Sequence, residues 1–337
     1  MESIEIELLE WVNKESTKMG SLSFNTIEPL RLEASKRRYY RLKNNNLSLI
    51  VNTLDPSEDD NLKFIEIGSF LIKNGVSVPE VISFNEEKNF LLQEDFGDDI
   101  YQFTLKDSNY DQLFTAAIDE ILLIQNSDHQ GANFPVFNKQ RAFKEMDLFG
   151  SWFFKDLLGF TEDPKLLKLF SDTYNQVWIN LEKQPKTLCH FDFETRNLMM
   201  LKDSAGVMDF QDALIGPVAL DLVSLLKDLY FPLSSEQTRK FIALYLKQAI
   251  DLGILDRVEL EEFIIWFEWT GVQRQLRIMG TLSRLYLRDG NASRLLDLEI
   301  ILEYLITSCE TLNEMDSFLE LLLESKPKLL TFLEHFK

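Results

Sequence analysis

The stretch LCHFDFETRNLMM, Leu188–Met200, decides the fold prediction because it reads as a polar loop between two short buried strands. The loop holds an acid, Asp192, and an amide, Asn197, five positions later. A second acid, Asp209, follows in GVMDFQDA, after a segment that can form a hairpin and return beside Asn197. Phosphoryl transfer from ATP requires one carboxylate that orients a hydroxyl and two oxygen ligands for Mg²⁺. The sequence therefore predicts that Asp192 is a catalytic base and that Asn197 and Asp209 are metal ligands.

The alternative interpretation is that these residues form ordinary turns. Asp and Asn favour turns because their side chains hydrogen-bond to the local backbone. The full combination is more specific than the single pattern, since His190 precedes Asp192 by two positions and Phe210 follows Asp209 directly. We therefore prefer the catalytic interpretation, in which His190 supports the loop through a hydrogen bond.

The chain as a whole is acidic. It has 337 residues, with 35 Lys and Arg against 55 Asp and Glu, and a formal net charge of −20. This balance argues against a nucleic-acid binder and against docking on an anionic membrane, both of which need a basic surface. No apolar run approaches the roughly 20 residues that span a bilayer, and the first residues do not form a signal peptide. With only two cysteines, far apart in sequence, we expect a cytoplasmic protein with reduced thiols.

The periodicity of apolar residues changes along the chain. The first part predicts an amphipathic helix, a hairpin, a second helix that Gly75 ends, and two further strands, over residues 2–17, 37–54, 59–75, 79–84 and 89–94. From Tyr110 the pattern is helical, apart from short strands near 187–190, 198–201 and 205–209. We therefore predict an α+β protein of two lobes: a small antiparallel β-rich lobe over residues 1–95 and a large, mainly helical lobe over residues 96–337.

This layout resembles the protein-kinase-like fold and, within it, the aminoglycoside phosphotransferase superfamily. Further segments, in the same order, look like the bacterial N-acetylmuramate/N-acetylglucosamine 1-kinases, which phosphorylate the anomeric hydroxyl of cell-wall amino sugars in peptidoglycan recycling. They are RRYYRL, VPEVISF, NFLLQEDFGD, TRNLM, DFQDALIGPVALDLVSLLKDLY and GVQRQLRIMGTLSRLYLRDG. The resemblance covers about residues 25–295.

The resemblance implies an ATP- and Mg²⁺-dependent kinase of a small sugar, with Asp192 as the base and with Asn197 and Asp209 as the metal ligands. It also implies that the connector after Gln93 is a hinge whose backbone meets adenine, and that Asp221 braces the catalytic loop. The hinge residues are Glu94, Asp95 and Phe96. A plain acid at a helix start is the alternative for Asp221, because the helix dipole favours it there.

The sequence departs from many kinases of this fold in its phosphate-binding parts. It has no glycine between Gly20 and Gly68, and Asn52 stands where a strand lysine is common. The basic run SKRRYYR offers Arg38, and with less support Lys36, as a replacement phosphate grip, since guanidinium binds phosphate well. The alternative is a solvated strand edge, on which basic residues discourage aggregation.

The acceptor site is the least determined part of the prediction. The candidate acceptor contacts are Arg196, Gln211, Asp212 and Arg274, while pairing with surface acids is the alternative for most arginines of residues 270–290. Other acceptors that keep the chemistry are an aminoglycoside, choline or another small alcohol. A non-catalytic nucleotide-binding scaffold is the alternative from a different class. The sequence does not specify an oligomeric state.

Overall fold

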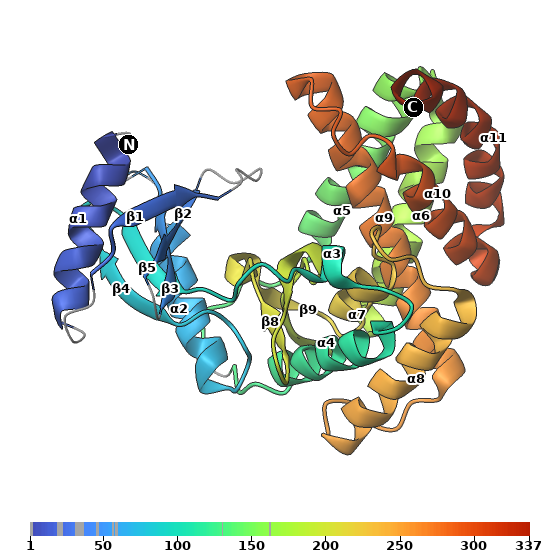
Figure 1. Cartoon of the computed structure of the whole chain (residues 1–337). Coiled ribbons are helices and arrows are strands. Elements are labelled where there is room, and N and C mark those ends of the chain that lie inside the picture. Colours follow the sequence, from blue (N-terminus) through green and yellow to red (C-terminus); the bar gives the residue numbers. More distant parts are fainter. Residues whose placement is uncertain are drawn as a thin grey trace. The chain divides into compact units, whose positions relative to one another are not determined.

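The computed structural model describes residues 3–18, 23–30, 37–44, 47–55, 57, 60–129, 131–161 and 163–337 (Figure 1). The chain divides into two compact units, Met1–Ser127 with Arg196–Asp212, and Asp128–Thr195 with Ala213–Lys337. The predicted base therefore belongs to the second unit, and the predicted metal ligands belong to the first. The lobe boundary that the sequence suggests near residue 95 stays a prediction.

The first unit contains a five-stranded antiparallel sheet in the order β1-β2-β3-β5-β4. Its strands are β1 Thr26–Pro29, β2 Arg38–Lys43, β3 Ser48–Thr53, β4 Val81–Asn85 and β5 Phe90–Glu94. β2 and β3 pair from Arg38 opposite Thr53 to Lys43 opposite Ser48, which confirms the predicted hairpin. The strands predicted before and after residue 86 are confirmed as β4 and β5.

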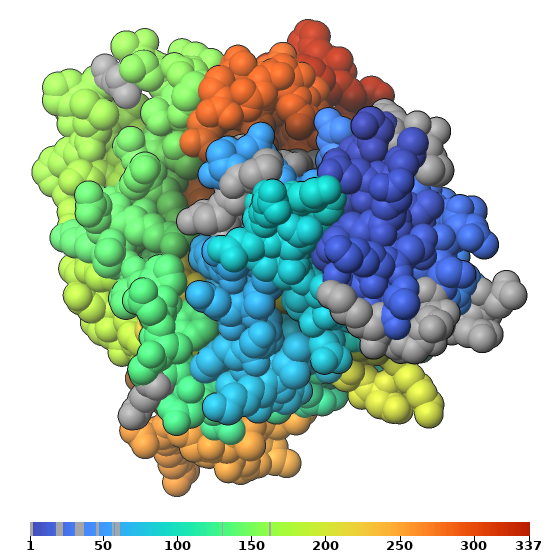
Figure 2. Space-filling model, turned by 90° about the vertical axis from the view of Figure 1, so that its left-hand side faces the viewer, coloured from blue at the N-terminus to red at the C-terminus, as the bar shows by residue number. Residues whose placement is uncertain are grey.

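One face of the sheet is covered by α1, Ser3–Lys18. Alternate residues of the central strands share that face because side chains alternate across a strand. They form a buried core with α1 that comprises Leu8, Trp11, Val12, Tyr40, Leu42, Leu49, Val51, Phe90 and Leu92. Figure 2 shows the dark blue surface of α1 beside the cyan surface of the β4–β5 region, where Lys88 pairs with Glu7.

The second predicted helix is α2, Asp60–Lys73. Gly75 follows it with a φ of 83°, a left-handed conformation that glycine adopts without strain. The unit continues with α3 Tyr101–Thr104 and α4 Tyr110–Gln125, and the later segment adds the hairpin of β7 Leu198–Met200 and β8 Ala205–Val207 and the short helix η3 Phe210–Asp212.

The second unit is mainly helical. Its elements are α5 Lys139–Leu148, η1 Phe149–Leu157, α6 Pro164–Lys183, β6 Lys186–Cys189, β9 Leu214–Pro217, α7 Leu220–Leu226, α8 Ser235–Asp251, α9 Leu260–Asp289, α10 Asp297–Thr311, η4 Asn313–Met315, α11 Asp316–Leu333 and η5 Glu334–Phe336. η2, Thr195–Asn197, lies where the chain passes between the units. The prediction that the chain is helical after the strand near 205–209 was wrong at Leu214–Pro217, which forms β9 and pairs antiparallel with β6.

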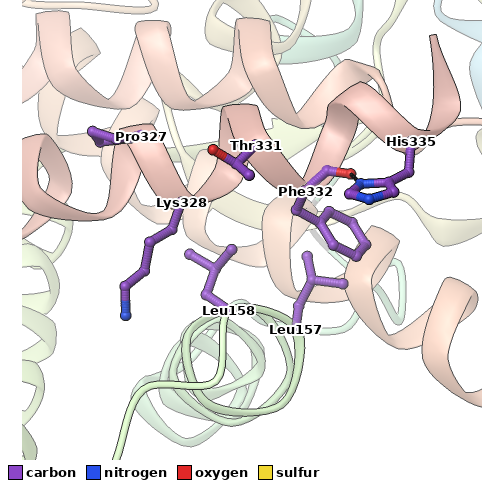
Figure 3. A pocket seen from close by; sticks show the side chains of 7 residues that line it. All are labelled: Leu157, Leu158, Pro327, Lys328, Thr331, Phe332 and His335. Carbon is purple, nitrogen blue, oxygen red and sulfur yellow. Dashed lines mark hydrogen bonds between the residues drawn. The ribbon is translucent and has the colours of Figure 1, made fainter.

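The long helix α9 packs against α5 and η1 at Gly280. A Cβ atom on Gly280 would lie 2.2 Å from the backbone carbon of Leu148, closer than any side chain permits. η1 is a π-helix, and its three phenylalanines are buried together with Phe170 of α6 in the core of this unit. Figure 3 shows Leu157, the last residue of η1, and the following Leu158 facing α11 across a hollow of about 390 Å³. Among the described residues, no helix is long and apolar enough to cross a membrane.

Candidate active site

The predicted base Asp192 lies in the loop that follows β6 in the second unit. At Phe191 the backbone has a φ of 82°, a left-handed conformation that a bulky residue rarely adopts. The N–H groups of His190 and Phe191 donate to the two carboxylate oxygens of Asp221, at 2.7 and 2.9 Å. Asp221 thus holds the turned backbone immediately before Asp192, which supports its predicted bracing role.

Asp221 occupies the first turn of α7 and is fully buried. Burial raises the pKa of Asp221, while the two N–H donors oppose this shift by stabilising the charged form. The ring of His190 is buried as well and packs edge-on against Phe193, with ring centroids 5.6 Å apart. His190 thus supports the loop by ring packing, while the hydrogen bond predicted for its side chain stays a prediction.

The remainder of the loop is tied to distant helices of the same unit. Glu194 accepts a hydrogen bond at 2.6 Å from the guanidinium of Arg274, which also donates to Oγ of Ser224 at 2.8 Å. Both Asp228 carboxylate oxygens accept from Thr195, one from its N–H and one from its hydroxyl, each at 2.9 Å. Sequence reasoning missed Glu194 and Asp228, and no local pattern marks their partners.

Arg274, one of the predicted acceptor contacts, has a side chain that is only 2% exposed. Through its hydrogen bonds to Glu194 and Ser224, the Arg274 side chain fixes the predicted catalytic loop to α7 inside the helical unit. Acceptor binding by Arg274 stays a prediction. Arg277, one turn further along α9, donates to Oδ1 of Asp192 at 2.7 Å.

In the first unit, the β7–β8 hairpin brings the two predicted metal ligands together. Leu198 pairs with Val207, and the N–H of Met208 donates to the carbonyl of Asn197 at 2.9 Å. Asp209 follows Met208 with a φ of 61°, and its carboxylate is exposed. An amide and a carboxylate oxygen are hard donors of the kind that Mg²⁺ prefers, so these two residues would suit that ion.

The residues after Asp209 rest on helix α2. Phe210 is buried, and its ring lies against Gly68, where a Cβ atom would meet it at 3.1 Å. Asp212, a predicted acceptor contact, pairs with Lys63 of α2 at 3.6 Å. The amide of Gln211 donates to Oδ1 of Asp209 at 2.6 Å. Gln211 thus contacts the predicted metal ligand Asp209, and Asp212 contacts α2. Arg196 is half-buried at the start of this segment, and its acceptor contact stays a prediction.

The predicted hinge is fixed by one carboxylate. Asp95 accepts hydrogen bonds from the hydroxyl of Ser48, from the guanidinium of Arg41 at 3.0 Å and from the N–H of Gly97 at 2.9 Å. Arg41 also pairs with Asp98. The Asp95 side chain is therefore fully used in holding the connector. The predicted contact with adenine would have to come from backbone groups of the connector.

The other two hinge residues differ in burial. Glu94 is exposed at the end of β5, where its N–H donates to the carbonyl of Glu80 at 3.0 Å. The ring of Phe96 fills the space above Gly206, where a Cβ atom would lie 2.6 Å from a ring carbon. Phe96 thus links the connector to the β7–β8 hairpin that carries the predicted metal ligands.

The basic run SKRRYYR, the predicted phosphate grip, includes arginines that differ in their surroundings. Arg38 lies exposed at the start of β2, and its guanidinium forms no ion pair with any described residue, whereas Lys36 lies outside the described residues. The neighbouring Arg37 is buried, donates to Oδ1 of Asn61 at 3.1 Å and lies over the ring of Phe64. Of the described arginines in this run, Arg38 is therefore the exposed one, and its phosphate-binding role stays a prediction.

A polar hollow of about 880 Å³ lies elsewhere in the first unit, between α4 and the β7–β8 turn. Its lining includes Asp99, Asp111, Asp119 and Lys202. It contains none of the predicted site residues, so it does not coincide with the candidate active site.

Comparison with solved structures supports the fold. An ADP-bound aminoglycoside phosphotransferase, APH(2'')-Ib, matches over 90% of this chain and 98% of its own, with a TM-score of 0.60 and 18% identity. The GDP complex of wild-type aminoglycoside 2'-phosphotransferase-IIIa matches over 89% and 97%, with a TM-score of 0.61 and 17% identity. The α+β architecture with a kinase-like fold is therefore confirmed.

Comparison of sequences identifies the family. An N-acetylmuramate/N-acetylglucosamine kinase of Pseudomonas aeruginosa is 31% identical over 294 residues, 87% of each chain. An enzyme of the same name from Neisseria meningitidis is 30% identical over 297 residues, 87% of this chain and 88% of its own. The model of the phosphotransferase enzyme family matches residues 26–260. This chain therefore belongs to the phosphotransferase enzyme family.

Proposed function

We propose that this protein is an ATP- and Mg²⁺-dependent kinase that phosphorylates the anomeric hydroxyl of N-acetylmuramate or N-acetylglucosamine. The observation that carries the proposal is the braced Asp192 loop, followed by a hairpin that joins Asn197 to Asp209. Relatives named as kinases of these two sugars match most of the chain and add the substrate. The acidic balance of the chain leaves small molecules as the expected ligands.

In the proposed reaction, the anomeric oxygen attacks the γ-phosphorus of ATP while its proton passes to the carboxylate of Asp192. A bond forms between the sugar oxygen and the γ-phosphorus, the bond from that phosphorus to the β,γ-bridging oxygen breaks, and ADP leaves. Asp192 then returns its proton to water. Since the loop backbone is fixed by Asp221, the base needs little reorganisation to meet the hydroxyl.

The remaining roles follow from the donor atoms present. Asn197 and Asp209 would hold Mg²⁺, which when bound neutralises charge on the phosphates. The exposed Arg38 would bind phosphate oxygens from the sheet, and the backbone of Glu94 and Phe96 would meet adenine. We further propose residues 1–95 as the nucleotide-binding lobe and Arg196, Gln211 and Asp212 as acceptor contacts.

The test is ADP release with ATP and Mg²⁺ against N-acetylmuramate, N-acetylglucosamine, simple hexoses, choline and an aminoglycoside. We expect turnover of the N-acetyl sugars and an acid-labile, alkali-stable sugar phosphate, as an anomeric phosphate should be. Asp192→Asn should lower kcat by at least about 100-fold, because general-base catalysis contributes that much.

The other outcomes separate the alternatives. Turnover with choline or an aminoglycoside alone would keep the chemistry and correct the acceptor. ATP-induced thermal stabilisation without turnover of any acceptor would support a nucleotide-binding scaffold, since a ligand of the folded state raises Tm. Asn197→Ala and Asp209→Ala should abolish the part of that stabilisation that depends on Mg²⁺.

A further inference from the structure

The guanidinium of Arg277 contacts the proposed base directly. Its Nη2 donates to Oδ1 of Asp192 at 2.7 Å, and both side chains are largely buried, 17% and 24% exposed. A charge-assisted hydrogen bond in such a setting is shorter and stronger than a neutral one and fixes the orientation of the carboxylate. Arg277 lies 85 residues beyond Asp192 in sequence, so this contact depends on the tertiary fold.

Arg277 is itself held in place from the loop side and from α5. Its guanidinium carbon lies 4.4 Å from the ring centroid of Phe191, the residue with positive φ next to the base. Cation–π contact of this kind restrains a guanidinium over the ring face. The carboxylate of Glu145 adds an attractive charge that favours the cation.

Glu145 is fixed by two donors. Nε of Arg141 donates to it at 2.8 Å, and the amide of Gln273 donates to it at 3.0 Å. The guanidinium carbon of Arg141 also lies 4.3 Å from the ring centroid of Phe191. The side chains of α5 and α9 therefore form a rigid polar frame around the ring that precedes Asp192.

We propose that Arg277 is a positioning residue for the base: it sets the orientation of the Asp192 carboxylate in which the acceptor hydroxyl is aligned with the phosphorus. The assignment rests on the proposed function of Asp192. It differs from binding an acidic group of the acceptor, because positioning affects every acceptor and acts on the chemical step, whereas binding affects the KM of acidic acceptors alone.

Steady-state kinetics of Arg277→Ala and Arg277→Lys, with N-acetylmuramate and with N-acetylglucosamine, test the proposal. We expect Arg277→Ala to lower kcat for both sugars by about 10- to 100-fold, the size of effect that slight misplacement of a catalytic group produces. The acceptor KM should change less than about threefold. Arg277→Lys should recover part of kcat, since it restores the charge without the planar geometry.

Two controls distinguish positioning from a fold defect. Arg288→Ala removes a guanidinium from the exposed end of the same helix, where it pairs with its neighbour Asp289, and should leave kcat unchanged. In the Asp192→Asn background, Arg277→Ala should add no further loss, because residues that act as a unit are not additive. Thermal unfolding of each variant checks that it is folded.

The pH profile of kcat/KM gives an independent readout. In Arg277→Ala, the fall of kcat/KM on the acidic side of the profile (the acid limb) should occur at higher pH than in the wild type. The reason is that the positive charge of Arg277 favours the ionised form of the Asp192 carboxylate. Asp192 also interacts electrostatically with Asp221 and Arg274, and Arg277 interacts with Glu145, Glu194 and Arg274. His190 lies beside Asp221, Arg141 lies over the ring of Phe191, and the variant alters none of these groups.

An unchanged kcat and acid limb in a folded Arg277→Ala enzyme would overturn the assignment while leaving the proposed function intact. A rise in the KM of N-acetylmuramate alone would also overturn it, in favour of carboxylate binding. If the wild-type protein turns over none of the acceptors, the proposed function fails and the assignment fails with it.

Discussion

The ring of Phe64 in α2 stacks on the ring of Phe210, with their centroids 4.4 Å apart and their planes inclined by 28°. Phe210 follows the proposed metal ligand Asp209 directly, so the stack ties α2 to the segment that presents this carboxylate. Gly68, one turn further along α2, leaves room for the same ring. Any change in this contact should therefore affect both stability and the metal position.

Phe64→Ala tests that link. We expect a loss of about 3 kcal/mol or more in the free energy of unfolding, because a buried aromatic ring is replaced by a cavity. The Mg²⁺ concentration at half-maximal activity should rise as well. Chemical denaturation and a Mg²⁺ titration measure the two effects, and Phe103→Ala, at a ring that is 66% exposed, is the control. Equal stability of the two variants would contradict the prediction.

Gly280→Ala should destabilise the protein although alanine favours helices. The intrinsic gain of about 1 kcal/mol in α9 is outweighed because the new Cβ overlaps the backbone of Leu148. Overpacking of this kind costs about 1–3 kcal/mol, and more where backbone must move. Thermal unfolding of Gly280→Ala beside Leu287→Ala, at an exposed position of the same helix, measures it. A higher Tm for Gly280→Ala would show that α5 and α9 separate readily at this crossing.

Arg38→Ala and Arg41→Ala should have different effects although both arginines lie on β2. Arg41→Ala leaves the buried carboxylate of Asp95 without its cation, so we expect a loss of about 3 kcal/mol in stability together with a raised KM for ATP. Arg38→Ala removes an exposed side chain, so it should raise the KM for ATP with little change in Tm. Nucleotide titrations and thermal unfolding separate the two, and an unchanged KM in Arg38→Ala would exclude it as the phosphate grip.

Ionisation of the buried Glu120 should contribute to the pH dependence of the free energy of unfolding. Burial raises the pKa of this carboxyl above its ordinary value of 4.5, while hydrogen bonds from Ser77 partly oppose the shift. Its contribution to stability is therefore complete below pH 4.5 and is lost as the pH rises through the folded-state pKa. Relative to the wild type, Glu120→Gln should gain stability as the pH increases above 4.5.

Glu261→Gln provides a control of opposite sign. The exposed Glu261 pairs with Arg239, whose hydrogen bond lowers the pKa of the carboxyl. The stability that this ion pair contributes is present above the ordinary pKa of Glu261 and is lost as the pH falls. The free energy of unfolding of Glu261→Gln should therefore be nearest to that of the wild type at low pH. Urea unfolding at several pH values measures both trends, and parallel trends would refute the assignment for Glu120.

The sequence predicted most of the first unit because its signals are local. The hairpin of β2 and β3, the helix α2 with its ending at Gly75, and the β7–β8 turn each depend on residues adjacent in the chain. The proximity of Asn197 and Asp209 could be predicted for the same reason, since only a short hairpin separates them in the chain.

What the sequence did not reveal depends on distant pairing. β9 is a four-residue apolar run directly before a helix, and only its partner β6 makes it a strand. Similarly, Glu194 with Arg274 and Thr195 with Asp228 are joined across 80 and 33 residues. The π-helical hydrogen bonding of η1 was also missed, because apolar periodicity does not distinguish it from an α-helix.

The first unit is built from two separate stretches of chain, and this bears on how the protein is synthesised. Its second stretch, Arg196–Asp212, supplies Phe210 for α2 and the N–H of Val207, which donates to Ser77 at 2.7 Å. A nascent chain that has emerged only to Ser127 therefore lacks part of this core. Because domains tend to fold as they leave the ribosome, we expect the packing around α2 to be completed only after residue 212 has emerged, whereas the core between α1 and the sheet needs no residue of the later stretch.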